Sequence, residues 1–238
     1  MTAGEELREK LAAFGAGSVP EKEEKLEKYR ILLAEWNSRV NLTAITDPEE
    51  VRRKHFLDSL TFSAAAEPAD GNTLLDVGSG AGLPGIPLAV AFPALKVTLL
   101  ETLQKRCRFL EEVKAQLGLD NVTVLQGRAE DLARDPAFRG TFDLVTARAV
   151  APLGVLAEYC LPFVRTGGLF VAYKSRTAEE ELAAAANAVT TLGGSPEGIT
   201  ACNIGGDVET RALVRIRKTA ETPEKYPRRA GIPAKRPL

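Results

Sequence analysis

The sequence has few of the residues that metal centres and disulfide frameworks need. Its 238 residues include one histidine, His55, and three cysteines that lie far apart, at Cys107, Cys160 and Cys202. There is no CxxC pair and no second histidine, so we expect no structural zinc, no other metal site and no disulfide framework. A reducing, cytoplasmic location follows as an expectation.

Long apolar runs and an excess of one charge are also missing. The apolar stretch 85–92 is far shorter than the roughly 20 residues of a membrane helix, and no hydrophobic core follows the charged N-terminus, so we expect no secretory signal and no membrane partner. The net charge is −1, from 31 basic and 32 acidic residues. This excludes a globally basic coat for nucleic acid but allows a local basic patch.

The patterns that are present predict one α/β domain with a helical extension. In residues 1–71, Leu26, Tyr29, Leu33, Trp36 and Val40 recur at three- and four-residue steps, which is typical of an amphipathic helix. From residue 72, β-type runs at 73–77, 96–101, 121–126, 142–147 and 168–174 alternate with helical runs. Repeated strand–helix units predict a mostly parallel sheet with helices on both faces.

The end of the chain departs from this alternation. Two strand patterns, at 197–204 and 211–218, are joined by Gly205-Gly206-Asp207 without a helix, which predicts an antiparallel edge. We divide the chain into a helical extension (1–71), an α/β domain (72–220) and a basic, proline-rich tail (221–238). Residues 222–238 carry five basic residues against Glu224 alone. The tail is too rich in proline and glycine for a predicted helix, and it is either a disordered end or an RNA-binding arm.

The most informative segment is the loop after the first predicted strand. Asp76 lies at the end of that strand, and Gly78, Gly80, Gly82 and Gly85 alternate with other residues before a helix. A loop that turns sharply and brings its backbone against a ligand cannot carry Cβ atoms. Four glycines in eight residues exceed the needs of a ligand-free turn, so we predict a nucleotide-binding loop.

Two cofactor classes fit this loop. Gly80-x-Gly82-x-x-Gly85 matches the dinucleotide fingerprint, which would suit an NAD(P)-dependent oxidoreductase. The glycine that directly follows the strand is Gly78, however, and from there the pattern D-x-G-x-G-x-G resembles the first motif of class I S-adenosylmethionine-dependent methyltransferases. Glu101 ends the next strand and is placed to accept ribose hydroxyls in either class. The register of the loop and the lack of a Tyr-x-x-x-Lys pair disfavour the oxidoreductase.

Further segments carry a closer resemblance. They are WN at 36–37, NLT at 41–43, RKHFLDS at 53–59, DVGSGAGLPGIPL at 76–88, KR at 105–106, RFL at 108–110, RA at 148–149 and YPRRAG at 226–231. Together they are similar to the bacterial 16S ribosomal RNA guanine-N7 methyltransferases, historically called glucose-inhibited division protein B. The resemblance spans most of the chain from about residue 30.

This resemblance implies a Rossmann-like class I methyltransferase sheet and methyl transfer from S-adenosylmethionine to N7 of a guanine in 16S ribosomal RNA of the small subunit. Ala129 and Glu130 fall where that family reads the adenine; the alternative for them is a helix start with acids that favour its dipole. The implied cofactor-binding positions are Asp76, Gly78, Gly80, Gly82, Leu83, Glu101, Ala129, Glu130 and Arg148.

The residue inventory agrees with that reaction. No [DN]PP[YF] motif follows the fourth strand, where residues 146–149 read TARA, and this disfavours adenine amine methylation. Cys107 and Cys160 lie inside predicted helices, which disfavours the cysteine nucleophile that pyrimidine C5 methylation needs. Guanine N7 has an in-plane lone pair and no proton to lose, so we name no catalytic base.

A guanine in folded RNA is approached past phosphates, so basic side chains should surround the cofactor pocket. His55 has an alternative role as a packing histidine, with a pKa lowered by its cationic neighbours 52–54 and with Asp58 within reach. A non-catalytic RNA-binding domain is a further alternative for the whole protein. The candidate RNA-binding residues are Arg53, Lys54, His55, Lys105, Arg106, Lys174, Arg228 and Arg229.

Overall fold

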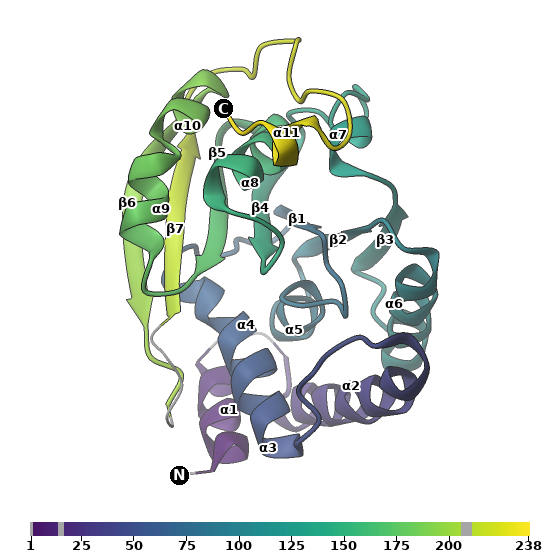
Figure 1. Cartoon of the computed structure of the whole chain (residues 1–238). Coiled ribbons are helices and arrows are strands. Elements are labelled where there is room, and N and C mark those ends of the chain that lie inside the picture. Colours follow the sequence, from purple (N-terminus) through teal and green to yellow (C-terminus); the bar gives the residue numbers. More distant parts are fainter. Residues whose placement is uncertain (1, 14–16, 206–210) are drawn as a thin grey trace.

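The computed structural model describes residues 2–13, 17–205 and 211–238, and a seven-stranded sheet lies at its centre (Figure 1). The strand order is β3-β2-β1-β4-β5-β7-β6. Strands β1 to β5 pair in parallel, while β7 runs antiparallel to both β5 and β6. The predicted fold, with its antiparallel edge, is confirmed. The strands are β1 Thr73–Val77, β2 Lys96–Glu101, β3 Val122–Gln126, β4 Phe142–Arg148, β5 Val164–Lys174, β6 Gly194–Cys202 and β7 Arg211–Lys218.

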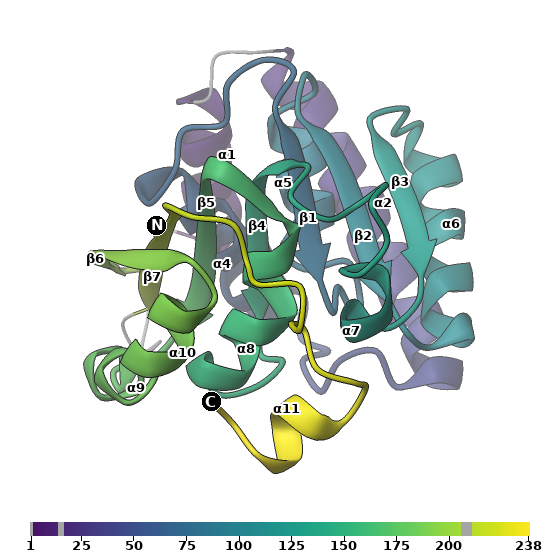
Figure 2. The same ribbon diagram turned by 90° about the horizontal axis from the view of Figure 1, so that it is seen from above.

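Helices cover both faces of the sheet because the strands carry apolar side chains on each face. One face packs against the N-terminal helices with α5 and α6, and the other against α7 to α10 (Figure 2). The first group comprises α1 Ala3–Ala12, α2 Val19–Val40, α3 Pro48–Val51, the π-helix η1 Arg52–Leu57, α4 Asp58–Leu60, η2 Thr61–Ala64, α5 Gly85–Ala91 and α6 Gln104–Leu117. The second comprises α7 Ala129–Leu132, α8 Leu153–Cys160, η3 Leu161–Phe163, α9 Ala178–Ala184 and α10 Ala186–Thr191.

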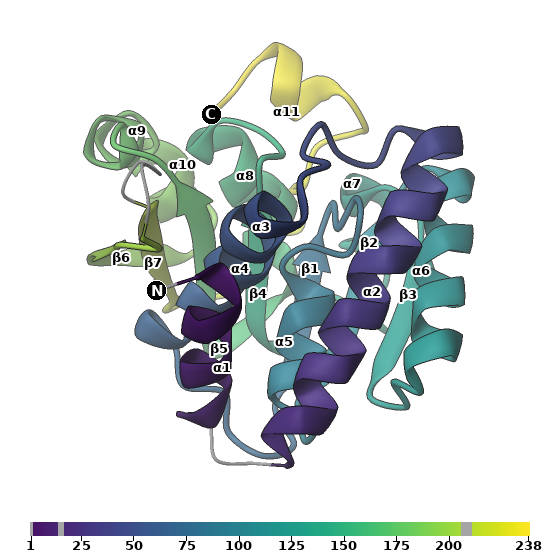
Figure 3. The same ribbon diagram turned by 90° about the horizontal axis from the view of Figure 1, so that it is seen from below.

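The predicted apolar stripe of α2 is the face that packs inward. Leu26, Tyr29 and Leu33 are buried in the same core as Phe109 of α6. Asn41 ends the helix in the left-handed region with a φ of 51°, as asparagine tolerates. The helical extension and the sheet thus share one hydrophobic core, seen from the helical side in Figure 3. The boundary at residue 71 stays a prediction about folding units.

The tail differs from the sequence-based expectation. It contains a short helix, α11 Ile232–Lys235, where no helix was predicted. Pro233 stands in its first turn, where the missing amide hydrogen has no partner to lose. Tyr226 is buried, and Arg139 donates hydrogen bonds to the carbonyls of Thr222 and Tyr226. The tail is therefore docked on the domain.

Other departures are small. The helical segment between β5 and β6 is divided at Ala185 into α9 and α10. The predicted connection at 205–207 lies mostly outside the described residues. Within the described ranges, no helix has the length and apolar character to cross a membrane.

Candidate functional site

The glycine loop connects β1 to α5 at the carboxyl edge of the sheet. Gly78, Gly80 and Gly82 have φ values of +73°, +59° and +90°, a region that side chains disfavour. A Cβ atom on Gly78 would lie 2.8 Å from a methyl group of Val150, and one on Gly82 would lie 2.6 Å from Ile86. At Gly78 and Gly82 the backbone path and the neighbouring side chains both favour glycine, whereas at Gly80 the backbone path alone does.

Asp76 holds the loop from beneath. Its carboxyl group is fully buried, and Oδ2 accepts a hydrogen bond from the Gly85 amide at 3.0 Å. Burial raises the pKa of Asp76 to about 7. Its second oxygen, Oδ1, is buried and has no hydrogen-bond partner among the described residues. The carboxyl group thus positions the loop and keeps one polar atom unsatisfied.

Glu101, at the end of β2, lies directly against this loop. Its Oε2 accepts from the Gly80 amide at 3.0 Å, and Oε1 accepts from the amides of Thr102 and Leu103 at 2.7 and 2.8 Å. A carboxylate has about four acceptor positions. These three bonds fix the carboxylate beside the glycines and leave capacity for a ribose hydroxyl.

Ala129 and Glu130 follow β3 and complete a row of three adjacent strand ends. Both are buried, and Glu130 Oε1 accepts from the amide of Gly231 in the tail at 2.9 Å. Ligands of open α/β sheets bind outside this edge. Loop glycines at positive φ, an orphaned buried oxygen and two strand-end carboxylates fit the adenosine-bearing cofactor that the resemblance implies.

A second feature, a cavity of about 350 Å³, lies where β4, β5 and β7 meet the N-terminal helices. Its volume is in the lower range of ligand pockets. The residues around it include Lys54, His55, Arg148, Tyr173, Lys174 and Arg211. Three candidates for RNA contact and one for cofactor contact, far apart in sequence, thus share one cavity.

Asp58 organises the cations of this cavity. It is fully buried, and its two oxygens pair with Arg148 Nη1 at 2.6 Å and Arg211 Nε at 2.7 Å. The expectation that Asp58 would meet His55 or Lys54 is replaced by this bridge to two strands, because its side of the helix faces the sheet. Sequence reasoning did not single out Arg211. The predicted antiparallel edge was the available signal, since it brings the start of β7 beside the end of β5.

His55 is a neutral, packed side chain. Nδ1 lies 3.1 Å from the Lys54 carbonyl and Nε2 lies 2.8 Å from Thr43 Oγ1, which assigns the proton to Nδ1. Burial first, and the positive charges of Arg148 and Arg211 with it, lower its pKa to about 4. The sequence suggested the neighbouring cations 52–54 as the cause, but burial and these two arginines account for the shift. His55 occupies a π-helix, a geometry that often marks functional sites.

The segment after β4 joins the two features. Arg148 lines the cavity, and Val150, two residues later, lies over Gly78 of the glycine loop. Lys174 Nζ donates to the Ala151 carbonyl at 2.9 Å and to Glu181 at 2.7 Å, which ties this segment to β5. The loop and the cavity are therefore neighbours with a shared wall.

The candidate RNA-binding residues divide into two groups. Lys105 and Arg229 are exposed, and no ion pair within the described part of the chain holds them. The others, apart from His55, pair with acids: Arg53 with Glu6, Lys54 with Glu50, Arg106 with Glu101, Lys174 with Glu181 and Arg228 with Glu158. A paired cation is less available to a phosphate, so Lys105 and Arg229 are the better candidates.

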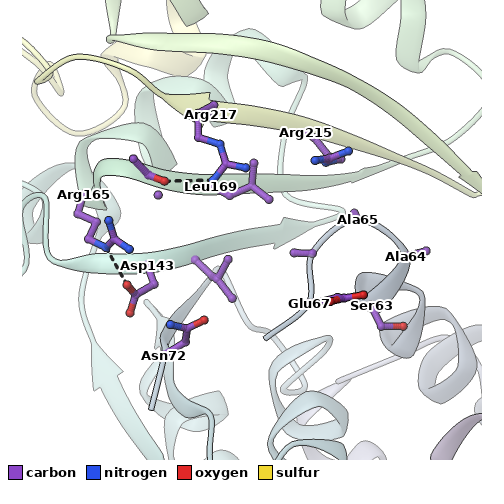
Figure 4. A pocket seen from close by; sticks show the side chains of 14 residues that line it. Ser63, Ala64, Ala65, Glu67, Asn72, Asp143, Arg165, Leu169, Arg215 and Arg217 are labelled. Carbon is purple, nitrogen blue, oxygen red and sulfur yellow. Dashed lines mark hydrogen bonds and ion pairs between the residues drawn. The ribbon is translucent and has the colours of Figure 1, made fainter. Parts of the chain in front are cut away.

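A cavity of about 480 Å³ lies at the opposite edge of the sheet (Figure 4). Arg165 pairs there with Asp143, and Arg217 donates to the Gly167 carbonyl. None of the predicted site residues lines it. Along β5 it is about 20 Å from Lys174. Its position at the amino ends of the strands separates it from the site.

Comparisons with known proteins agree with the geometry. The family model described as rRNA small subunit methyltransferase G matches residues 22–214. Proteins named ribosomal RNA small subunit methyltransferase G are similar throughout: that of Symbiobacterium thermophilum is 49% identical, covering 98% of this chain and 96% of the relative, and that of Bacillus subtilis is 45% identical, covering 98% of each. A solved SAM-dependent methyltransferase from Aquifex aeolicus shares the fold, with a TM-score of 0.53 and 16% identity over 71% of this chain and 93% of that one.

Proposed function

The chain belongs to the rRNA small subunit methyltransferase G family, and from this premise we propose that it transfers a methyl group from S-adenosylmethionine to N7 of a guanine in 16S ribosomal RNA. The 16S RNA, free or within the small subunit, is the proposed partner. A substrate of this kind favours the cytoplasm as the place of action.

One observation carries the proposal: the glycine loop and the cavity share the segment after β4. Val150 covers Gly78 on one side, and Arg148 lines the cavity on the other. A cofactor in the loop and a base in the cavity would therefore be neighbours. Methyl transfer depends mainly on bringing two reactants together in line, and this arrangement supports it.

The side chains of the cavity suit a guanine that needs no general base. When bound, the cofactor supplies an electrophilic methyl group. His55 is neutral, and its ring nitrogens are occupied by Lys54 and Thr43, so it moves no proton. Arg148, Lys174 and Arg211 provide donors for O6 of guanine, which lies beside N7, while the N7 lone pair stays free to attack. Their pairing with Asp58 and Glu181 limits repulsion of a cationic cofactor.

The alternative functions receive no support. The oxidoreductase inferred from GxGxxG finds none in the comparisons, where the family and the named relatives are methyltransferases. A non-catalytic RNA-binding domain would leave the link between loop and cavity without a role.

The test is transfer of a labelled methyl group to 16S RNA, offered as free RNA and as assembled small subunits lacking the modification. The label should appear in one or both substrates, and mapping by mass should place it on N7 of one guanine. Label on another atom would contradict the proposed position. No label in either substrate, from protein that binds S-adenosylhomocysteine, would contradict the proposed substrate.

A further inference from the structure

The docked tail forms a strap that runs along the α7–α8 face of the sheet from its amino edge to its carboxyl edge (Figure 2). We define the C-terminal strap as residues 222–238. Its first part is held from below, since Arg139 donates to the carbonyls of Thr222 and Tyr226 and Arg134 donates to that of Pro227. The strap then crosses beside α8 and α7, in yellow in Figures 1 and 2. A segment rich in proline and glycine is thus ordered by side chains of the domain.

Arg228 is the anchor of the strap. Its amide donates to Glu158 Oε1 at 2.7 Å, and its guanidinium donates Nε at 3.0 Å to Oε1 and Nη2 at 2.6 Å to Oε2. The side chain of Glu158 is 1% exposed. A bidentate bond to a buried carboxylate fixes direction as well as distance. Position and orientation of the strap at residue 228 are therefore defined.

Three residues later the strap reaches the cofactor site. The amide of Gly231 donates to Glu130 Oε1 at 2.9 Å. Glu130 is 5% exposed and directly follows the β3 edge. Its other oxygen, Oε2, makes no hydrogen bond within the described residues. One oxygen of Glu130 thus belongs to the strap, and the other stays available to a donor such as the amine of adenine.

We propose that the C-terminal strap is the outer wall of the adenine end of the cofactor site, and that Arg228 acts as a positioning residue for nucleoside binding through Gly231 and Glu130. The inference rests on the proposed function, which assigns S-adenosylmethionine to this edge. The strap holds the Glu130 carboxylate in one orientation before the nucleoside arrives. Preorganisation of this kind raises affinity because less freedom is lost on binding.

Two adjacent arginines of the strap look equivalent in sequence but have different roles. Arg228 is half-buried and anchored, so it serves the cofactor site. Arg229 is exposed and unanchored, so it faces solvent and suits a phosphate. Arg229→Ala is therefore a matched control for Arg228→Ala, with the same charge change one residue away.

The experiment measures binding of S-adenosylhomocysteine by titration calorimetry, with thermal unfolding of each variant as a check on folding. Arg228→Ala should weaken binding about tenfold. Arg229→Ala should leave it unchanged. The affinity of Arg228→Lys should lie between those of the two alanine variants, because lysine restores the charge without the bidentate geometry. Adenosine alone should lose the same factor as S-adenosylhomocysteine, since the strap acts at the adenine end.

A double-mutant cycle with Glu130→Ala tests the route. If Arg228 acts through Glu130, Arg228→Ala should add less than about twofold in the Glu130→Ala background. A tenfold effect that persists there would overturn the route. Arg228→Ala protein that folds and binds S-adenosylhomocysteine like the wild type would overturn the inference. If the alanine variant does not fold, unchanged affinity of Arg228→Lys would overturn it. Wild-type protein that binds no S-adenosylhomocysteine would instead refute the proposed function.

Discussion

Burial decides what the polar side chains of this site do. His55, Asp58 and Asp76 are all buried, yet each is held differently: a neutral imidazole, a carboxylate between two arginines, and a carboxyl group with one unpaired oxygen. Burial moves the pKa of His55 down to about 4 and that of Asp76 up to about 7. Each shift disfavours the charged form, as desolvation requires. The free energy of unfolding should therefore depend on pH through both groups.

The pKa of His55 predicts a specific pH dependence. Between pH 6.5 and about 4 the unfolded chain binds a proton at His55 that the folded chain does not, so folding stability falls as pH falls through this window. The contribution lost is about 3 kcal/mol. Asp76 has the opposite effect on folding stability. Its raised pKa makes the folded chain hold a proton that the unfolded chain releases, so stability falls as pH rises toward about 7.

The variant His55→Gln isolates the contribution of His55 to this pH dependence. Urea unfolding of wild type and His55→Gln should be compared from pH 4.5 to 8. The stability of the wild type relative to His55→Gln should decline as pH drops below 6.5. A difference that stays constant over this range would show that His55 titrates normally. Asp76→Asn provides a check of opposite sign, since the wild type should lose stability relative to it as pH rises toward 7.

At the scale of elements, strand ends place the chemistry. β1, β2 and β3 lie side by side and in parallel, so Gly80 of the glycine loop, Glu101 and Glu130 meet at one edge although they are 21 or more residues apart. The positive φ values of the loop restrict which residues it can contain more than any other local feature does. Substitution there should affect ligand binding more than the fold.

Gly78→Val should abolish binding of S-adenosylhomocysteine. The new side chain must adopt a φ of +73° and meets Val150, at a cost of about 2 kcal/mol. Val150 is partly exposed and has room to shift, so the chain should still fold. Gly140→Val is the matched control, because Gly140 has a φ of +65° and open space around it. It should lose similar stability and keep full affinity. Equal affinity of folded Gly78→Val would show that the loop does not contact the ligand.

At the scale of the whole molecule, a net charge of −1 hides an uneven distribution. Most candidate RNA-binding cations are engaged by acids, whereas Lys105 and Arg229 are exposed near the carboxyl edge, after β2 and on the strap. Exposed, unpaired cations are those that release counterions when they meet phosphates. RNA affinity should therefore depend on a few residues of one edge.

Lys105→Ala and Arg229→Ala should each weaken RNA binding and lower the slope of log affinity against log salt by about 0.7 to 0.9. Lys96→Ala is the control, because Lys96 is an exposed lysine at the other end of β2. Its slope should match that of the wild type. A change of slope for Lys96→Ala equal to that for Lys105→Ala would place the RNA elsewhere. Affinity should be measured with small-subunit RNA at several salt concentrations.

Local patterns were enough to predict most of the architecture. Apolar runs separated by helical periods define β1 to β5, and glycine spacing defines the loop, because both depend on neighbours in the chain. The missing helix between the last two strands predicted the antiparallel edge in the same way. The cofactor class also followed from local order, through the place of Gly78 directly after β1. Local spacing could not predict the docking of the tail, whose proline and glycine content favoured either a free end or an RNA arm.

The partners of buried charges depend on the assembled fold. Asp58 pairs with Arg148 and Arg211, which are 90 and 153 residues away, and Arg228 pairs with Glu158, 70 residues away. Nothing in the spacing of these residues signals such pairs. A buried carboxylate takes whichever cation the packed elements bring within reach, since leaving it unpaired costs several kcal/mol. Composition and pattern could thus identify the basic residues, but folding paired Arg148 and Arg228 with buried acids and left Lys105 and Arg229 facing solvent.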